Sequence, residues 1–185
     1  MEYSLSTLKT NTIQAATGST INIATGTNLS GPAGSIVAPG SIIQVVNGPA
    51  NAARIVSTST SYIDTPISAT ITPKFATSKI LVTYSTIIVC TNLHYLYLEL
   101  VRNIAGGSFS AVNANEDASL LDGYTDTASF MMTGHQALDS PNTTSACIYK
   151  VQMRSAASSN SATVGRGTNS DNKNSMNITL MEIAQ

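Results

Sequence analysis

Two adjacent runs of strand length in the middle of the chain, Lys79–Cys90 and His94–Arg102, constrain the fold more than any other feature. The first run consists almost entirely of β-branched and aliphatic residues, which suit a pleated, packed surface better than a helix. In the second run, leucines at every second position alternate with tyrosine, glutamate and valine. A period of two places Leu96, Leu98 and Leu100 on one face of a sheet. The pattern predicts a hairpin, turning at Thr91-Asn92, at the centre of a β-domain.

Shorter alternating runs separated by turn signals predict the remaining strands. One of them is bracketed by Pro66 and Pro73, which cannot donate to a β-ladder and therefore indicate an edge strand or a strand boundary. The runs are Ser41–Val46, Ser57–Asp64, Ile67–Thr72, Phe109–Val112, Ser129–Thr133, Gln136–Leu138, Thr144–Arg154 and Ser175–Ile183. No stretch favours a helix. The sequence therefore predicts an all-β domain over residues 41–185, an antiparallel, jelly-roll-like β-sandwich.

Residues 1–35 differ from this domain because they repeat a short unit. Ala16-Thr17-Gly18 and Ala24-Thr25-Gly26 lie eight residues apart, and each follows a short alternating run that contains isoleucine. Two such units are too few to bury their own apolar side chains, so an ordered stalk requires other copies of the chain. A disordered tail is the alternative. Residues 36–40 then form a turn-rich hinge. The candidates for a shared oligomer axis are Ile13, Ile21, Ile23 and Leu29.

The composition excludes several classes of protein. Charged residues make up 10 % of the chain and the net charge is −1, whereas about a quarter of an average domain is charged. A nucleic-acid partner is disfavoured because no basic cluster is present. No apolar run reaches the about 20 residues of a membrane span, and the N-terminus lacks the features of a signal peptide. We expect a protein made in a cytoplasm that stays there or leaves within a larger assembly.

The sequence predicts no catalytic, cofactor or metal site. Phosphate-binding, hydrolase and zinc-protease motifs are absent, and the two histidines, His94 and His135, lie far apart in sequence. The two cysteines, Cys90 and Cys147, are expected to be buried free thiols, with a cross-strand disulfide as the minority alternative. Four carboxylates cluster in an irregular segment; we expect solvated loop charges, and a bound cation there stays open. They are Glu116, Asp117, Asp122 and Asp126.

Tyr95 and Tyr97 lie opposite the leucine face of their strand. If that face is exposed, the rings are able to stack on sugars; if it meets a second sheet or subunit, they are core or interface residues. The neighbouring Val101 shares the face and favours packing.

Several strings, taken together, resemble a family of marine bacteriophage virion proteins. They are TLKTNTIQAATGSTINIATGTNLSGPAG, GSIIQVV, SYIDTPISATITPKFATSKILVTYS, ALDSPNTTSACIYKVQMR and NITLMEIA, which cover about residues 7–46, 58–90, 137–154 and 175–184. The family comprises short tail-fibre-like proteins of phages that infect cyanobacteria and other ocean bacteria. The resemblance implies a homotrimeric virion appendage, assembled in the host cytoplasm, without enzyme activity. Residues 103–136 and 155–174 match nothing in it.

Three functional hypotheses follow. The first is a trimeric tail fibre or fibre-like appendage, with the N-terminal segment docked to other virion proteins and the loops at 103–136 and 155–174 facing a host-surface glycan or protein. The second is a capsid decoration or head-fibre protein of the same fold. The third is a carbohydrate-binding, lectin-like module that works alone.

Overall fold

The computed structural model describes residues 25–26, 31, 37–48, 54–90, 95–112, 131–165 and 176–185. The chain divides into two compact units, Met1–Ile36 and Val37–Gln185, and the fold that follows is that of the second unit. Within these described ranges every regular element is a β-strand and there is no helix. The prediction of an all-β domain is therefore confirmed for this part of the chain.

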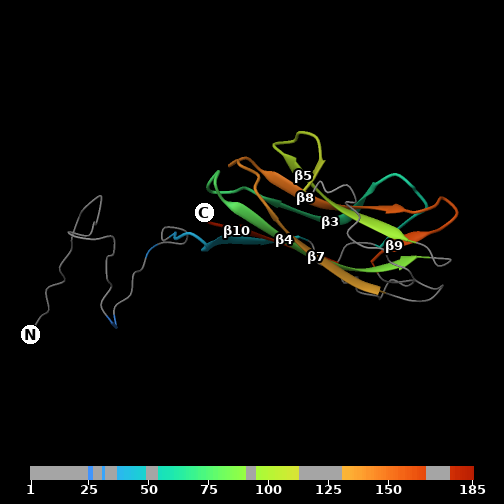
Figure 1. The fold of residues 1–185 in the computed structure, drawn as a ribbon, viewed down its shortest axis with the longest axis horizontal. Coiled ribbons are helices and arrows are strands. Elements are labelled where there is room, and N and C mark those ends of the chain that lie inside the picture. Colours follow the sequence, from blue (N-terminus) through green and yellow to red (C-terminus); the bar gives the residue numbers. More distant parts are fainter. Residues whose placement is uncertain are drawn as a thin grey trace, which may run out of the picture. The chain divides into compact units, whose positions relative to one another are not determined.

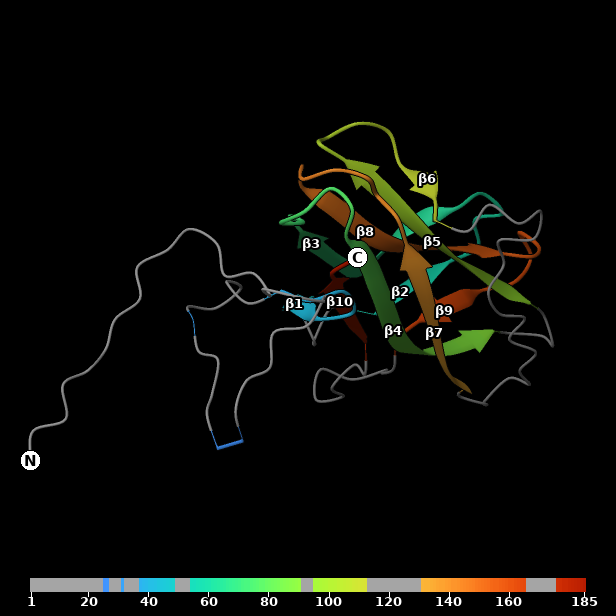
Figure 2. The same cartoon turned by 60° about the vertical axis from the view of Figure 1, so that its left-hand side comes forward.

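The strands form two antiparallel sheets, which lie as two layers in Figures 1 and 2. Sheet A contains, in spatial order, β1 (Ile42–Asn47), β10 (Asn177–Ile183), β4 (Lys79–Cys90) and β7 (Met131–Asp139). The far end of β4 also pairs with β9 (Ala162–Val164), which pairs with β2 (Ile55–Ser57). Sheet B has the order β3 (Ile63–Ile71), β8 (Cys147–Ser155), β5 (Leu96–Ile104) and β6 (Ser110–Ala111).

The order of the strands is that of a jelly roll. Each sheet alternates early and late strands, so that the first strand, β1, pairs with the last, β10, and β3 pairs with β8. Such pairings require connections that cross repeatedly between the two layers. The antiparallel sandwich predicted from strand count and turn spacing is present in the described residues.

The core lies between the two sheets and follows directly from alternation. Leu96, Leu98 and Leu100 of β5 are at most 3 % exposed, and they belong to one hydrophobic cluster with Ile80 and Val82 of β4. Burying a side chain of this size stabilises a fold by about 1.5–3 kcal/mol. The predicted leucine face is confirmed, as is the buried face of β8. The β8 residues are Cys147, Tyr149, Val151 and Met153.

The predicted central hairpin is wrong, although both of its strands exist. β4 covers Lys79–Cys90 as predicted, and β5 begins at Leu96, but β4 belongs to sheet A and β5 to sheet B. The two strands face each other across the core instead of pairing along their edges. Alternation determines which face of a strand is buried, but it does not determine the strand's partner.

Three further strand predictions need correction. The segment predicted as one strand at Ser57–Asp64 bends between β2 and β3, because its serine hydroxyls bond to nearby backbone groups: the Ser59 amide donates to Ser57 Oγ, and Ser59 Oγ donates to the Ser61 carbonyl. The strand predicted from Ile67 begins at Ile63 and includes Pro66, at a register irregularity; because β3 is an edge strand of sheet B, the edge position predicted for this proline is confirmed. The predicted loop at 155–174 contains β9.

The two fragments predicted at Ser129–Thr133 and Gln136–Leu138 are joined in the structure. They form the single strand β7, which runs from Met131 to Asp139 along β4. Gly134, which lies between the two fragments, pairs with Ser85 within this ladder.

Candidate functional site

The outer face of sheet A, made of the side chains that point away from the core on β1, β10, β4 and β7, carries a continuous apolar row. Val45, Met181, Leu81 and Leu138 are successive cross-strand partners across these four strands. Directly opposed side chains lie about 4.5–5.5 Å apart at Cβ, so the four form one contiguous surface. Val45 and Leu138 are each 52 % exposed. The row is therefore apolar surface that this chain does not cover within the described residues.

The row on one side of this apolar row contains Ile42, Ile183 and Lys79, and the rows on the other side are polar and uncharged. Asn47, Thr179, Thr83 and Gln136 form the next row across the four strands, and Asn177, Ser85 and Gly134 form the one after it. Lys79, at one end of β4, is the single charged residue on the outer face of sheet A as the described strands define it. Contiguous exposed apolar surface with a polar rim is typical of an interaction site.

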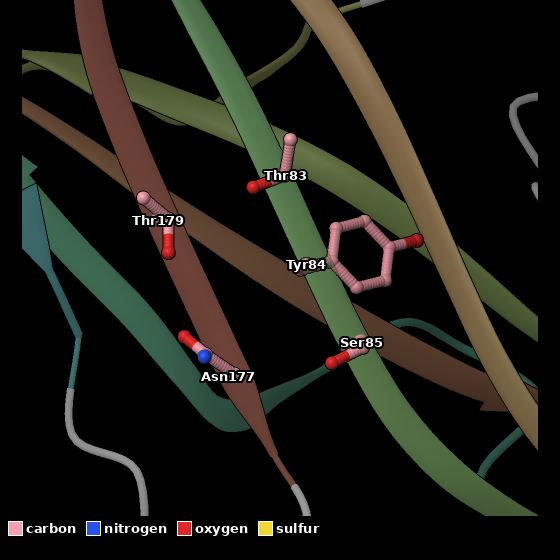
Figure 3. Close-up of a pocket in the computed structure, with 5 residues that line it drawn as sticks. All are labelled: Thr83, Tyr84, Ser85, Asn177 and Thr179. Atoms are coloured by element: carbon pink, nitrogen blue, oxygen red, sulfur yellow. The ribbon is translucent and has the colours of Figure 1, made fainter.

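A small hollow lies over β4 and β10 on this face (Figure 3). Its volume is about 140 Å³, and it is lined by Thr83, Tyr84, Ser85, Asn177 and Thr179. The Thr179 hydroxyl donates to Asn47 Oδ1 at 2.9 Å. The lining offers hydroxyl and amide groups and no acid or base that ionises near neutral pH. Its chemistry supports hydrogen bonding.

The outer face of sheet B differs, because it carries aromatic rings and charges of both signs. Arg154 of β8 lies between two tyrosines: its guanidinium carbon is 3.9 Å from the ring centroid of Tyr97 on β5 and 5.4 Å from that of Tyr62, which precedes β3. Both distances are typical of cation–π contacts. Tyr97 thus points away from the leucine face, as predicted, but it is half-buried and outside the core. The prediction that Tyr95 and Tyr97 pack inside a sandwich core is wrong, and a contact with another subunit stays a prediction.

A second row follows next to the tyrosines on the outer face of sheet B. Gln152 pairs with Asp64 on one side and with Glu99 on the other. Asp64 accepts hydrogen bonds from Lys150 at 2.6 Å and from Gln152 at 2.9 Å, and these bonds hold its pKa below the usual value. Burial raises the pKa of Glu99, and the positive charge of Arg154 opposes that shift.

Two buried carboxylates serve the architecture. Asp139 of β7 crosses from sheet A to sheet B, where Oδ2 accepts a hydrogen bond from Arg102 at 2.5 Å and another from the Tyr149 hydroxyl at 2.6 Å. Glu182 of β10 is fully buried and accepts from the Gln44 amide and from the backbone amides of Lys74 and Phe75. Both carboxylates are cross-strand neighbours of Ile80, at the same end of sheet A, and their hydrogen bonds join segments that are distant along the chain, so we assign both a structural role.

Tyr84 and His135 are a cross-strand pair of β4 and β7 on the inner face of sheet A. The Tyr84 hydroxyl and His135 Nε2 are buried without a hydrogen-bond partner among the described residues. Burial raises the pKa of Tyr84 and lowers that of His135. Their ring centroids are 6.1 Å apart.

The remaining candidates that the sequence suggested fall into two groups. Cys90 and Cys147 are buried, and neither forms a disulfide; burial raises the pKa of the Cys90 thiol to about 11. His94, the four clustered carboxylates and the four predicted axis residues lie outside the described residues; they are His94, Glu116, Asp117, Asp122, Asp126, Ile13, Ile21, Ile23 and Leu29. In the described ranges no group of three His, Cys, Asp or Glu side chains is arranged to hold a metal ion, and no helix is long and apolar enough to span a membrane.

The sequence patterns did not predict the apolar row on the outer face of sheet A, nor the row of Tyr62, Arg154 and Tyr97 on the outer face of sheet B. Both depend on which strands are neighbours, and a pattern within one strand does not contain that information. Alternating hydrophobicity predicts that Tyr97 points away from the core, but only the pairing of β5 with β8 brings Arg154 next to Tyr97 and Glu99.

Comparisons with known proteins yield structures of virus particles but no family. No family model matches the chain, and no curated protein matches it. The VP2 subviral particle of infectious bursal disease virus shares 13 % identity at a TM-score of 0.41, over 85 % of this chain and 46 % of that one. A solved structure of the Gx strain of the same virus shares 12 % identity at a TM-score of 0.39, over 76 % of this chain and 37 % of that one. The chain spans less than half the length of these chains, and similarity at this level carries no argument about function.

Proposed function

We propose that this chain is a structural subunit of a virus particle, namely a fibre-like appendage of a bacteriophage that assembles as a homotrimer. The observation that carries the proposal is the outer face of sheet A. Its apolar row, Val45, Met181, Leu81 and Leu138, and its uncharged polar rows form a broad surface with Lys79 as its one charge among the described strands. Surfaces of this kind favour stable contact with another protein.

A second copy of the chain fits this face well. Burying a charge in an interface is expensive unless the charge finds a partner, and the outer face of sheet A, over its described strands, presents no carboxylate and only the peripheral Lys79. Two copies would therefore remove apolar surface from water without burying unpaired acids. The N-terminal repeat supports the same conclusion from sequence, since its isoleucines need other copies to be buried.

Two other lines support a virion role. The sequence strings resemble phage tail-fibre-like proteins, and jelly rolls are widespread in viral capsid proteins and lectins. A fold alone does not define a function, so the fold only agrees with the proposal. The N-terminal segment, residues 1–35, would form the stalk that docks to other virion proteins. A capsid decoration or head-fibre protein would use the same face and the same trimer, and it differs only in its position on the particle.

The mass of the full chain in solution tests the assembly. Light scattering behind size exclusion should give three times the 19.2 kDa of one chain. The Ile21→Asp/Ile23→Asp double variant should lose the trimer, because it places charges on the proposed axis. A monomeric parent protein would refute the trimer, and an unchanged double variant would refute the shared axis.

The location of the protein on the virion tests the functional assignment itself. Immunogold labelling of intact particles with an antibody against this chain should place gold on the tail. Gold on the capsid would replace the tail fibre with the decoration protein. Intact particles that carry no label would reject the virion role altogether.

A further inference from the structure

The outer face of sheet B holds a set of polar groups that the fold does not use. Arg154 makes two ring contacts but donates no hydrogen bond to a described residue, and no described carboxylate lies within ion-pair distance of it. The two ring contacts help to hold the guanidinium in place, and its N–H groups remain as donors. Arg154 therefore presents pre-oriented donors to whatever lies over this face.

Glu99 supplies the matching acceptors. It lies on β5 diagonal to Arg154, since Tyr97 is the direct partner of Arg154 and Glu99 is the partner of Gln152. Diagonal neighbours are about 7–8 Å apart at Cα, within reach of long side chains. The structure nevertheless shows no hydrogen bond between Glu99 and another described residue, and partial burial raises the pKa of its carboxyl group. A donor-rich and an acceptor-rich group thus lie side by side without bonding to each other.

The charges on this face balance. Asp64 and Lys150 bond to each other, and Glu99 and Arg154 are the remaining pair of opposite sign. An anionic ligand on Arg154 would meet Glu99, and a cationic ligand on Glu99 would meet Arg154. A neutral ligand with hydroxyl groups on adjacent carbons satisfies both groups, because one hydroxyl donates to the carboxylate while its neighbour accepts from the guanidinium.

Aromatic groups flank these polar groups at both ends. Tyr95 is 40 % exposed beside the Tyr97 end of the face, and Phe109 is 38 % exposed where it covers Lys150. From Arg154 to Lys150 the central strand rises about 13 Å, which leaves space for more than one sugar ring. The rings offer apolar surface to the ring face of a sugar, and the groups between them offer hydrogen bonds to its hydroxyls.

We infer that the outer face of sheet B binds a neutral saccharide, whose vicinal hydroxyls bridge Glu99 and Arg154 beside Tyr97 and Tyr62. The inference rests on the proposed function in one respect: it names the chemical class of the host-surface receptor that such an appendage would contact. The inner faces build the sandwich, the outer face of sheet A contacts another copy, and the outer face of sheet B stays open to the ligand.

A glycan array probed with the full chain tests the inference, followed by titration with the neutral trisaccharide that gives the strongest signal. The parent protein should bind neutral glycans, and Arg154→Met and Glu99→Gln should each weaken binding about tenfold or more, because each removes a hydrogen bond to a charged group. The matched control is Ser140→Ala, an exposed polar residue just after β7 and outside both outer faces, which should bind like the parent. Circular dichroism of each variant verifies its fold.

Three results would overturn the inference: an array without a hit, binding confined to sialylated, sulfated or uronic-acid glycans, or unchanged affinity in both Arg154→Met and Glu99→Gln. The mass measurement separates this inference from the proposed function. A trimer that binds no glycan rejects the saccharide site alone, whereas a monomer that binds glycan through Arg154 and Glu99 rejects the appendage alone.

Discussion

The outer faces of the two sheets are built by the same alternation but have opposite chemistry. On sheet A, the row Val45, Met181, Leu81 and Leu138 is apolar, and the next row on one side of it consists of amides and hydroxyls. On sheet B, Tyr62, Arg154 and Tyr97 lie beside a row with two carboxylates. The inner faces of both sheets are alike, since both supply the one hydrophobic cluster. The inner faces therefore specify the fold, and the difference between the outer faces indicates a division of labour between assembly and recognition.

The largest effect on stability should come from the carboxylate of Asp139, which links the two sheets. Asp139→Asn removes the carboxylate that binds both Arg102 and Tyr149 across the sheets. The Asp139 side chain is 9 % exposed and that of Arg102 is 20 % exposed, so a largely buried positive charge loses its partner. We expect the free energy of unfolding to fall by about 3 kcal/mol or more, measured by urea denaturation.

Asp64→Asn provides the matched control on the outer face of sheet B. The Asp64 side chain is 56 % exposed in its pair with Lys150, and exposed pairs contribute about 0–1 kcal/mol. Equal losses in Asp139→Asn and Asp64→Asn would contradict the structural role assigned to Asp139.

The second-largest effect should be on self-association, which we assign to the outer face of sheet A and not to that of sheet B. The Val45→Glu/Leu138→Glu double variant places two carboxylates at opposite ends of the apolar row on sheet A. Both positions are about half exposed, so the fold should persist while self-association weakens about 100-fold, because acids in an interface without cationic partners are costly. Analytical ultracentrifugation across a dilution series measures the change.

Thr70→Glu tests whether any added acid has the same effect. Thr70 is exposed on β3 of sheet B, and this variant should associate like the parent protein. Dissociation of Thr70→Glu, or intact trimers in the double variant, would reverse the assignment of the two faces.

The sequence predicted the inner faces of the sandwich better than its outer faces, for a physical reason. Burial imposes a period of two, so Leu96, Leu98 and Leu100 revealed their orientation without knowledge of their partners. The predicted hairpin of β4 and β5 failed because that same period is silent about pairing. Strand β9 was missed because Ala162–Val164 is too short to show a period.

The candidate sites depended still more on pairing. The apolar row of sheet A brings together residues 45, 81, 138 and 181, and no local pattern links them. Buried Asp139 and Glu182 likewise read as ordinary charges in the sequence, because their partners, Arg102 and Gln44, are distant along the chain.

A smaller effect should distinguish the two tyrosines beside Arg154. Tyr97→Leu removes the ring at 3.9 Å from the guanidinium, and Tyr62→Leu removes the ring at 5.4 Å. Cation–π contacts at partly exposed sites contribute about 0.5–1 kcal/mol, so Tyr97→Leu should cost about that much in urea denaturation and Tyr62→Leu less. Tyr97→Phe keeps the ring and should retain most of the stability. A loss in Tyr97→Phe as large as that in Tyr97→Leu would assign the effect to the hydroxyl group.

The smallest effect concerns the dependence of stability on pH, because a histidine, His135, lies on the inner face of sheet A. Burial lowers the pKa of His135 below its ordinary value of 6.5, so the unfolded chain binds a proton more readily than the folded one does. The stability linked to His135 is therefore fully present above about pH 7 and is lost as the pH falls through 6.5 toward the lowered folded pKa. The urea midpoint of the parent should be lower at about pH 5.5 than at about pH 7.5, and His135→Gln should reduce this difference. An identical pH dependence in His135→Gln would assign the slope to His94 and the carboxyl groups, and would place His135 in contact with water in the folded state.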